Sequence, residues 1–212
     1  MASLCVTLGL MMDDIHIIIL AAGLSRRMGD VNKLLLDIDG APMVRRTAEL
    51  YSSIFSSVTL VSGYEAGKIE RAVEGLSLNI LHNPDFTQGQ QSSVRCGLRS
   101  IPDSCEAVFI ALADQPFLTP QDISDFTMAF MDSPRDKIFI PYHHEQRGNP
   151  VIFPACLLLK ADESPRAFID AHPDRVQRYR VSNDHFTTDI DRPQDVEGLG
   201  KNACQTPLSE RK

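Results

Sequence analysis

Residues 15–29, IHIIILAAGLSRRMG, are the stretch of sequence that decides the fold. The apolar run at 15–20 predicts a strand buried on both faces, which is typical of a parallel sheet covered by helices. The small residues after it predict a turn with outward-pointing backbone N–H groups, flanked by the cations Arg27 and Lys33. A strand leading into a cationic turn of this kind is typical of a polyphosphate site, so we expect nucleotide chemistry.

Strand and helix patterns alternate along the rest of the chain. Strands are expected at 58–62, 78–81, 107–113, 137–141, 151–153 and 178–181, and helices at 43–54, 66–73, 92–98, 122–131, near 167 and after 193. This alternation predicts an α/β protein, a three-layer α/β/α sandwich around a mainly parallel, Rossmann-like sheet with ligands at the carboxyl ends of the strands. We expect one domain over 15–199, a flexible leader over 1–14 and a loose tail over 200–212.

Composition narrows the class of protein. A balance of 21 Lys+Arg against 28 Asp+Glu gives a net charge of -7, which argues against nucleic acid as a partner and favours a small nucleotide. No run reaches the roughly 18 apolar residues of a membrane helix, so we expect no membrane association. Five cysteines without a C-x-x-C pair suit a cytoplasmic protein with free core thiols.

The glycine-containing loop has neither of the common nucleotide-binding spacings. Gly23 and Gly29 fit neither the G-x-G-x-x-G nor the G-x-x-x-x-G-K-[ST] pattern. Arg27 and Lys33 can neutralise the charge that builds on a departing pyrophosphate. The alternative is an ordinary strand-to-helix turn that carries surface cations.

Several segments in order resemble one family. LAAGLSRRMG at 20–29 with NKLLL at 32–36 resembles the signature of the small nucleotidyltransferases of molybdenum-cofactor biosynthesis, most closely the cytidylyltransferase type. Further matches are NP at 83–84 with Gly89 and SS at 92–93, ADQP at 113–116, RGNPV at 147–151 and DIDRPQD at 189–195. The resemblance covers residues 15–199 and implies the nucleotide-diphospho-sugar transferase type of sheet.

The resemblance also implies a reaction and a set of site residues. CMP would pass from CTP to the terminal phosphate of molybdopterin with release of pyrophosphate, aided by Mg²⁺, and molybdoenzymes or cofactor-maturation proteins would be partners. The implied roles are catalysis by Arg27 and Lys33; nucleotide binding by Leu20, Ala21, Ala22, Gly23, Ser25, Gly29, Asn83, Gly89 and Ser93; metal binding by Asp114 and Asp191; and acceptor binding by Arg147 and Asn149.

The residues leave alternatives for several of these roles. Asp114 follows an apolar strand and should emerge at the ligand edge of the sheet, but a turn or capping aspartate is also consistent. In an extended segment Asp189 and Asp191 share one face, so either is a candidate second metal ligand, and Asp191 could instead cap a following helix. Ser93 could cap a helix, and Arg147 could be an exposed hairpin residue.

Two features bear on the choice of substrate. The family's Gly-Asp-x-Gly-x-Arg stretch is here ADESPR at 161–166, so the identity of the acceptor stays open. The AAG motif at 21–23 resembles the cytidylyltransferase branch of the family rather than the guanylyltransferase branch. The alternatives are guanylyl transfer to the same cofactor, cytidylyl transfer to a sugar- or polyol-phosphate, and a nucleotide- or cofactor-binding protein without catalysis.

Overall fold

A single central sheet runs through the part of the chain that the structure describes. The structure is a computed structural model and describes residues 12–28, 31–158, 164–190 and 195. The order of strands is β10-β7-β9-β6-β1-β4-β5, and β8 pairs with β7. Their bounds are β1 (Ile15–Ala21), β4 (Val58–Ser62), β5 (Asn79–His82), β6 (Ala107–Leu112), β7 (Ile138–His143), β8 (Gln146–Arg147), β9 (Val151–Pro154) and β10 (Val176–Arg180).

The sheet is mainly parallel, as the sequence predicts. Strands β6, β1, β4 and β5 are parallel neighbours, and β10 is parallel to β7. Strand β9 is antiparallel to both β6 and β7. A short buried strand has the same apolar pattern in either direction, which is why the sequence does not give the direction of β9.

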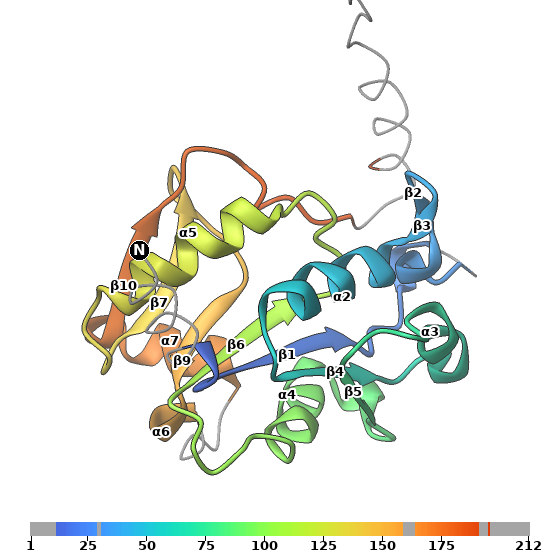
Figure 1. Ribbon diagram of the computed structural model, residues 1–212, viewed down its shortest axis with the longest axis horizontal. Helices are drawn as coiled ribbons and strands as arrows, with labels where there is room; N and C mark the ends of the chain where they lie inside the picture. The colour runs from blue at the N-terminus through green and yellow to red at the C-terminus, as the bar shows by residue number, and fades with distance from the viewer. Residues whose placement is uncertain (1–11, 29–30, 159–163, 191–194, 196–212) are drawn as a thin grey trace, which may run out of the picture.

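Helices cover both faces of the sheet, so the predicted three-layer arrangement is confirmed. Figure 1 shows α2 (Met43–Ile54) and α5 (Pro120–Met131) above the strands and α4 (Gln90–Leu98) and α6 (Ala155–Leu158) below them. Buried residues of α3 (Ala66–Ala72) join the core of α2 and α5, whereas those of α7 (Pro165–Ala171) join the core of α4 and α6.

Strand β1 feeds both cores because its side chains alternate between the faces of the sheet. Ile17 and Ile19 pack in the core of α2 and α5, and Ile18 and Leu20 pack in the core of α4 and α6. Each such side chain stabilises the fold by about 1.5–3 kcal/mol when fully buried. The continuous apolar run is therefore the sequence signal of a strand with a helix layer on either side.

The remaining elements are short. They are β2 (Asp37–Ile38), β3 (Ala41–Pro42), and the 3-10 turns η1 (Arg26–Met28), η2 (Lys33–Leu35), η3 (Phe86–Gln88) and η4 (Pro173–Arg175). Helix α4 begins at Gln90, earlier than predicted, because Gly89 with φ 96° takes the N-cap position. Helix α5 also begins earlier, behind a capping box between Thr119 and Asp122.

Two expectations from composition are tested by the described residues. No helix among them is long and apolar enough to cross a membrane. Of the described cysteines, all free, Cys96 is buried and Cys105 is half-buried, but Cys156 is exposed, so the expectation of core thiols is wrong for Cys156. Cys156 lies in the single turn of α6, which buries Ala155 and Leu158 and leaves the position between them facing water.

His16 is a buried polar residue in the first strand. Its Nδ1 lies 2.7 Å from Ser57 Oγ and its Nε2 lies 3.2 Å from Ser100 Oγ, which joins β1 to the start of β4 and the end of α4. Burial lowers the pKa of His16 from 6.5 to about 4. The folded protein therefore holds this imidazole neutral at neutral pH.

We expect His16 to make the protein sensitive to acid. Because the folded-state pKa lies below the unfolded value of 6.5, this contribution to stability is fully present above pH 6.5 and is lost as the pH falls toward about 4. Between about pH 7 and about pH 4.5 the wild-type free energy of unfolding should fall by about 2 kcal/mol more than that of His16→Gln. Urea denaturation at both pH values measures this difference, and equal losses in the two proteins would contradict it.

Candidate active site

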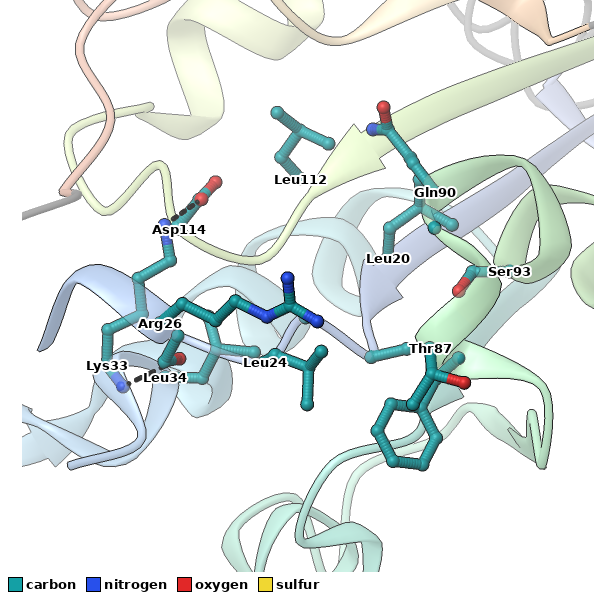
Figure 2. Close-up of a pocket in the computed structure, with 15 residues that line it drawn as sticks. Leu20, Leu24, Arg26, Lys33, Leu34, Thr87, Gln90, Ser93, Leu112 and Asp114 are labelled. Carbon is teal, nitrogen blue, oxygen red and sulfur yellow. Dashed lines mark hydrogen bonds and ion pairs between the residues drawn. The ribbon is translucent and has the colours of Figure 1, made fainter. Parts of the chain in front are cut away.

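A cavity of about 520 Å³ lies at the carboxyl ends of β1 and β6, the edge at which the sequence predicts a ligand. It brings together eight of the predicted site residues, namely Leu20, Ala22, Gly23, Ser25, Lys33, Gly89, Ser93 and Asp114. Figure 2 shows Lys33 from the loop after β1, Ser93 from α4 and Asp114 from the end of β6 around the same space. The fold thus gathers residues that are distant in the sequence into one concave surface.

The loop after β1 folds back on itself through short hydrogen bonds. Ser25 has a φ of 49°, its carbonyl accepts from Met28 N at 2.8 Å, and its Oγ accepts from Lys33 N at 3.2 Å. The buried Asn32 caps the next turn, because its Oδ1 accepts from Leu34 N at 3.1 Å. These bonds fix the backbone from which Lys33 reaches the cavity.

Two positions near this loop are glycine for different physical reasons. A Cβ on Gly63 would lie 2.7 Å from both Ala22 Cβ and Phe86 Cβ, so only glycine lets the wall containing Phe86 approach the loop. A Cβ on Gly23 would meet no atom within 4 Å. Gly23 lines the cavity, so its missing side chain leaves room that packing within the protein does not use.

An ion pair crosses the cavity between the loop after β1 and the end of β6. Lys33 Nζ lies 2.6 Å from Asp114 Oδ2, and the two side chains are only 13% and 16% exposed. Figure 2 shows the two side chains meeting end to end. The other carboxylate oxygen, Asp114 Oδ1, is buried without a hydrogen-bond partner in the protein. Asp114 therefore presents an acceptor with unused capacity beside a cation, a pattern typical of a ligand site.

The segment 182–190 connects Asp114 to the predicted acceptor loop. Ile190 N donates to Asp114 O at 3.1 Å. Phe186 O accepts at 2.8 Å from both Gln115 Nε2 and Asn149 N, so one carbonyl joins the end of β6 to the loop after β8. Of the predicted acceptor residues, Arg147 ends β8 and Asn149 lies in the loop that Phe186 O joins to the residue after Asp114, although neither lines the cavity.

Asp122 at the start of α5 anchors this same segment. Its carboxylate accepts from Asn183 Nδ2 at 2.9 Å and lies 2.8 Å from His185 Nδ1. Burial alone would raise the pKa of Asp122, but the hydrogen bonds from Thr119, Asn183 and His185 outweigh it and lower the pKa. The carboxylate is therefore ionised at neutral pH and holds the segment firmly.

Asn83 acts behind the cavity wall rather than on its surface. The side chain is buried, and its Nδ2 donates to Ser92 Oγ at 2.9 Å and to Ser93 Oγ at 3.0 Å. Because Gly89 is the N-cap of α4, the alternative of a capping role for Ser93 is wrong. Asn83 instead orients Ser93, which lines the cavity.

Other predicted residues lie elsewhere or outside the described part of the chain. Ala21 is buried, and its side chain belongs to the core of α2 and α5. Gly29, Asp191 and the side chain of Arg27 lie outside the described residues. Asp189 is exposed, next to the buried Ile190.

Arg147 has the features of a partly desolvated cation. Burial lowers its pKa, and its ion pair with Asp170 is long, with 3.8 Å between Arg147 Nη1 and Asp170 Oδ1. A cation in this state favours an anionic ligand over bulk water. The hairpin of the alternative is present, because Arg147 in β8 pairs with Tyr142 in β7, but the arginine side chain is only 29% exposed.

Several lining residues were not foreseen from the sequence. They are Leu24, Arg26, Leu34, Phe86, Thr87, Gln90 and Leu112. Figure 2 shows the Arg26 guanidinium reaching into the cavity, a cation in addition to the predicted Arg27. Whether Arg26 faces the cavity depends on the register of the 3-10 turn η1, and the sequence carries no signal for that register.

The described residues include no group of three or more His, Cys, Asp or Glu side chains that could hold a metal ion. Asp114 is nevertheless suited to one ligand position, because its Oδ1 is a buried oxygen without a partner. Mg²⁺ is commonly held by one or two carboxylates together with substrate phosphates and water. The donor set therefore fits a metal that shares its coordination with a phosphate ligand.

Comparisons with known proteins agree with this geometry. Residues 17–176 match the family described as the MobA-like NTP transferase domain. The molybdenum cofactor cytidylyltransferase of Escherichia coli is 26% identical over 181 residues, 85% of this chain and 88% of the relative. The probable molybdenum cofactor guanylyltransferase of Natronomonas pharaonis is 30% identical over 141 residues, 63% of this chain and 68% of the relative.

A solved structure supports the fold. A nucleotidyl transferase from Methanothermobacter has a TM-score of 0.75 at 20% identity, over 87% of this chain and 95% of that chain. The mainly parallel sheet with helices on both faces is therefore a known arrangement of nucleotidyltransferases.

The two glycines should respond differently to alanine. Gly63→Ala should lower the free energy of unfolding by about 1–3 kcal/mol, because its Cβ would overlap Ala22 and Phe86. Gly23→Ala should leave it unchanged or raise it by up to about 1 kcal/mol, because the new methyl group meets no atom and the unfolded chain loses freedom. Chemical denaturation of both variants measures the contrast, and a loss of stability in Gly23→Ala would show that the loop is packed more tightly than described.

Proposed function

We propose that this chain, which belongs to the MobA-like NTP transferase domain family, transfers CMP from CTP to the phosphate of molybdopterin and releases pyrophosphate. The observation that carries the proposal is the cavity in which the glycine loop, Lys33 and Asp114 meet. A glycine loop with a cation suits a triphosphate, and a carboxylate at the same point suits a metal that accompanies it.

The choice of CTP rests on one relative and one short motif. The relative matched over the larger share of this chain is a cytidylyltransferase. The AAG motif at 21–23 also resembles the cytidylyltransferase branch of the family. A guanylyltransferase on the same cofactor is the second candidate, favoured by the 30% identity to the relative from Natronomonas. Transfer to a sugar- or polyol-phosphate would keep the same cavity and change the acceptor.

The residues of this chain supply positioning and charge stabilisation. In the reaction an acceptor phosphate oxygen forms a bond to the α-phosphorus of the nucleotide, and the bond from that phosphorus to the bridging oxygen of pyrophosphate breaks. Lys33 and Arg26 would stabilise the negative charge on the departing pyrophosphate, and Arg27 remains a candidate for the same role. Gly23 leaves space for the phosphates to approach the backbone. Such transfer needs no covalent enzyme intermediate.

Mg²⁺ is proposed as the cofactor, held by Asp114 with Asp191 as the second ligand. When bound it would neutralise charge on the phosphates and orient the reacting group. The hydrogen bond from Ile190 N to Asp114 O supports this choice, because it holds the residue before Asp191 against Asp114. Asp189 is the alternative ligand from the same segment.

Arg147 and Asn149 are proposed to bind the phosphorylated acceptor. Arg147 ends β8, and the loop at Asn149 that follows is joined to the end of β6 through Phe186 O, which would bring an acceptor phosphate to the side of the nucleotide. The partial burial of the Arg147 guanidinium favours a phosphate partner.

Removal of the Asp114 carboxylate should abolish turnover and spare the fold. We expect Asp114→Asn to reduce pyrophosphate release by at least about 100-fold, because charge stabilisation at the phosphates is lost. Asp125→Asn, which changes an exposed carboxylate on α5, is the matched control and should behave as wild type. Comparing Asp189→Asn with Asp191→Asn in the same assay identifies the second ligand. Full turnover in Asp114→Asn would remove Asp114 from the mechanism.

The nucleotide and the chemistry can be tested together. With molybdopterin as acceptor, CTP should support faster pyrophosphate release than GTP, ATP or UTP, and mass spectrometry should detect the cytidine dinucleotide form of the cofactor. Chelation of Mg²⁺ should stop the reaction. Preference for GTP would favour the guanylyl alternative, and binding of CTP without pyrophosphate release with any phosphorylated acceptor would favour a non-catalytic binding protein.

A further inference from the structure

The Lys33–Asp114 ion pair involves the carboxylate that is proposed to hold the metal. Lys33 Nζ is 2.6 Å from Asp114 Oδ2, and both side chains are largely withdrawn from water. In the protein without ligands the ammonium group therefore neutralises the carboxylate that a metal would need. A divalent cation entering alone has to compete with a cation that is already attached to the chain.

The described residues give a free divalent cation few ligands to offset this competition. The described residues contain no group of three or more potential metal ligands that would compensate for displacing Lys33. A metal held by Asp114 would lie close to the ammonium group, and like charges in a partly buried site repel strongly. Without a nucleotide the site is therefore poorly suited to a bare divalent cation.

A nucleotide changes this balance because it brings anionic oxygens. The cavity has room beside Gly23, and Lys33 lines it. Triphosphate oxygens would give the ammonium group a new partner and at the same time complete the coordination of the metal. Lys33 would then pair with the triphosphate, and Asp114 would be available to the metal.

We propose that Lys33 is a specificity-determining residue that makes the site select the metal–nucleotide complex and reject the free divalent cation. This inference rests on the proposed function, since it takes a metal–triphosphate complex as the substrate. It assigns Lys33 a second task in addition to charge stabilisation. In the protein without nucleotide, Lys33 takes the place of the metal.

Binding of Mn²⁺ alone tests the proposal without any reliance on turnover. Electron paramagnetic resonance titration measures free Mn²⁺ in the presence of wild type, Lys33→Met and Lys33→Gln. We expect both variants to bind Mn²⁺ at least about 10-fold more tightly than wild type when no nucleotide is present, because Asp114 loses its internal cation. Circular dichroism of each variant establishes that it is folded.

Two controls isolate the ion pair. Lys68→Met removes a lysine that pairs with Glu65 on the surface of α3, so it changes net charge equally and should bind Mn²⁺ as wild type does. The double variant Lys33→Met with Asp114→Asn should lose the gain, because the released carboxylate is absent. When CTP is present, Lys33→Met should lose affinity for the Mn²⁺–CTP complex while wild type binds it.

The outcomes separate this inference from the proposed function. Mn²⁺ affinity in folded Lys33→Met and Lys33→Gln equal to that of wild type overturns the inference, even if wild type makes the dinucleotide product. An equal gain in Lys68→Met also overturns it, because the effect is then one of net charge. A gain confined to the Lys33 variants supports the inference even if the nucleotide proves to be GTP.

Discussion

The ion pair between Lys33 and Asp114 is the interaction on which the site depends. It joins the loop after β1 to the end of β6, two segments that the parallel sheet places at the same edge. A carboxylate that is only 16% exposed has little contact with water, and Lys33 supplies its charge partner within the protein. The contact therefore serves the folded state and leaves a carboxylate and a cation ready to exchange partners for a ligand.

The backbone around this pair is held by a second layer of hydrogen bonds. Asp122 fixes Asn183 and His185, and Phe186 O then receives both Gln115 and the loop at Asn149. On the other side of the cavity, Asn83 holds Ser93. Side chains set by packing and hydrogen bonds keep a site in the geometry that binding needs. The residues behind the cavity wall are thus as important to the arrangement as those that line it.

Much of this arrangement could be predicted from the sequence because the signals are local. The apolar run of β1, the strand–helix alternation and the small-residue loop after β1 each follow from a few neighbouring residues. The resemblance to a known family, carried by motifs in the same order, added the expectation that Lys33 and Asp114 serve one ligand. In the structure Lys33 Nζ lies 2.6 Å from Asp114 Oδ2. The direction of β9, the early start of α4 and the exposure of Cys156 were missed, because they depend on pairing, on the φ of Gly89 and on which side of a single helical turn faces water.

The sequence by itself determined the class of fold and the chemical character of the site, since hydrophobic periodicity and residue type are properties of short segments. The tertiary structure alone decided which residues of those segments contact one another. It placed Arg26 in the cavity, moved Asn83 behind its wall and turned the side chain of Ala21 into the core. It also joined Lys33 to Asp114 and brought Phe186 between Gln115 and Asn149. Contacts between residues far apart in the chain arise from how the layers pack, and no local pattern encodes that packing.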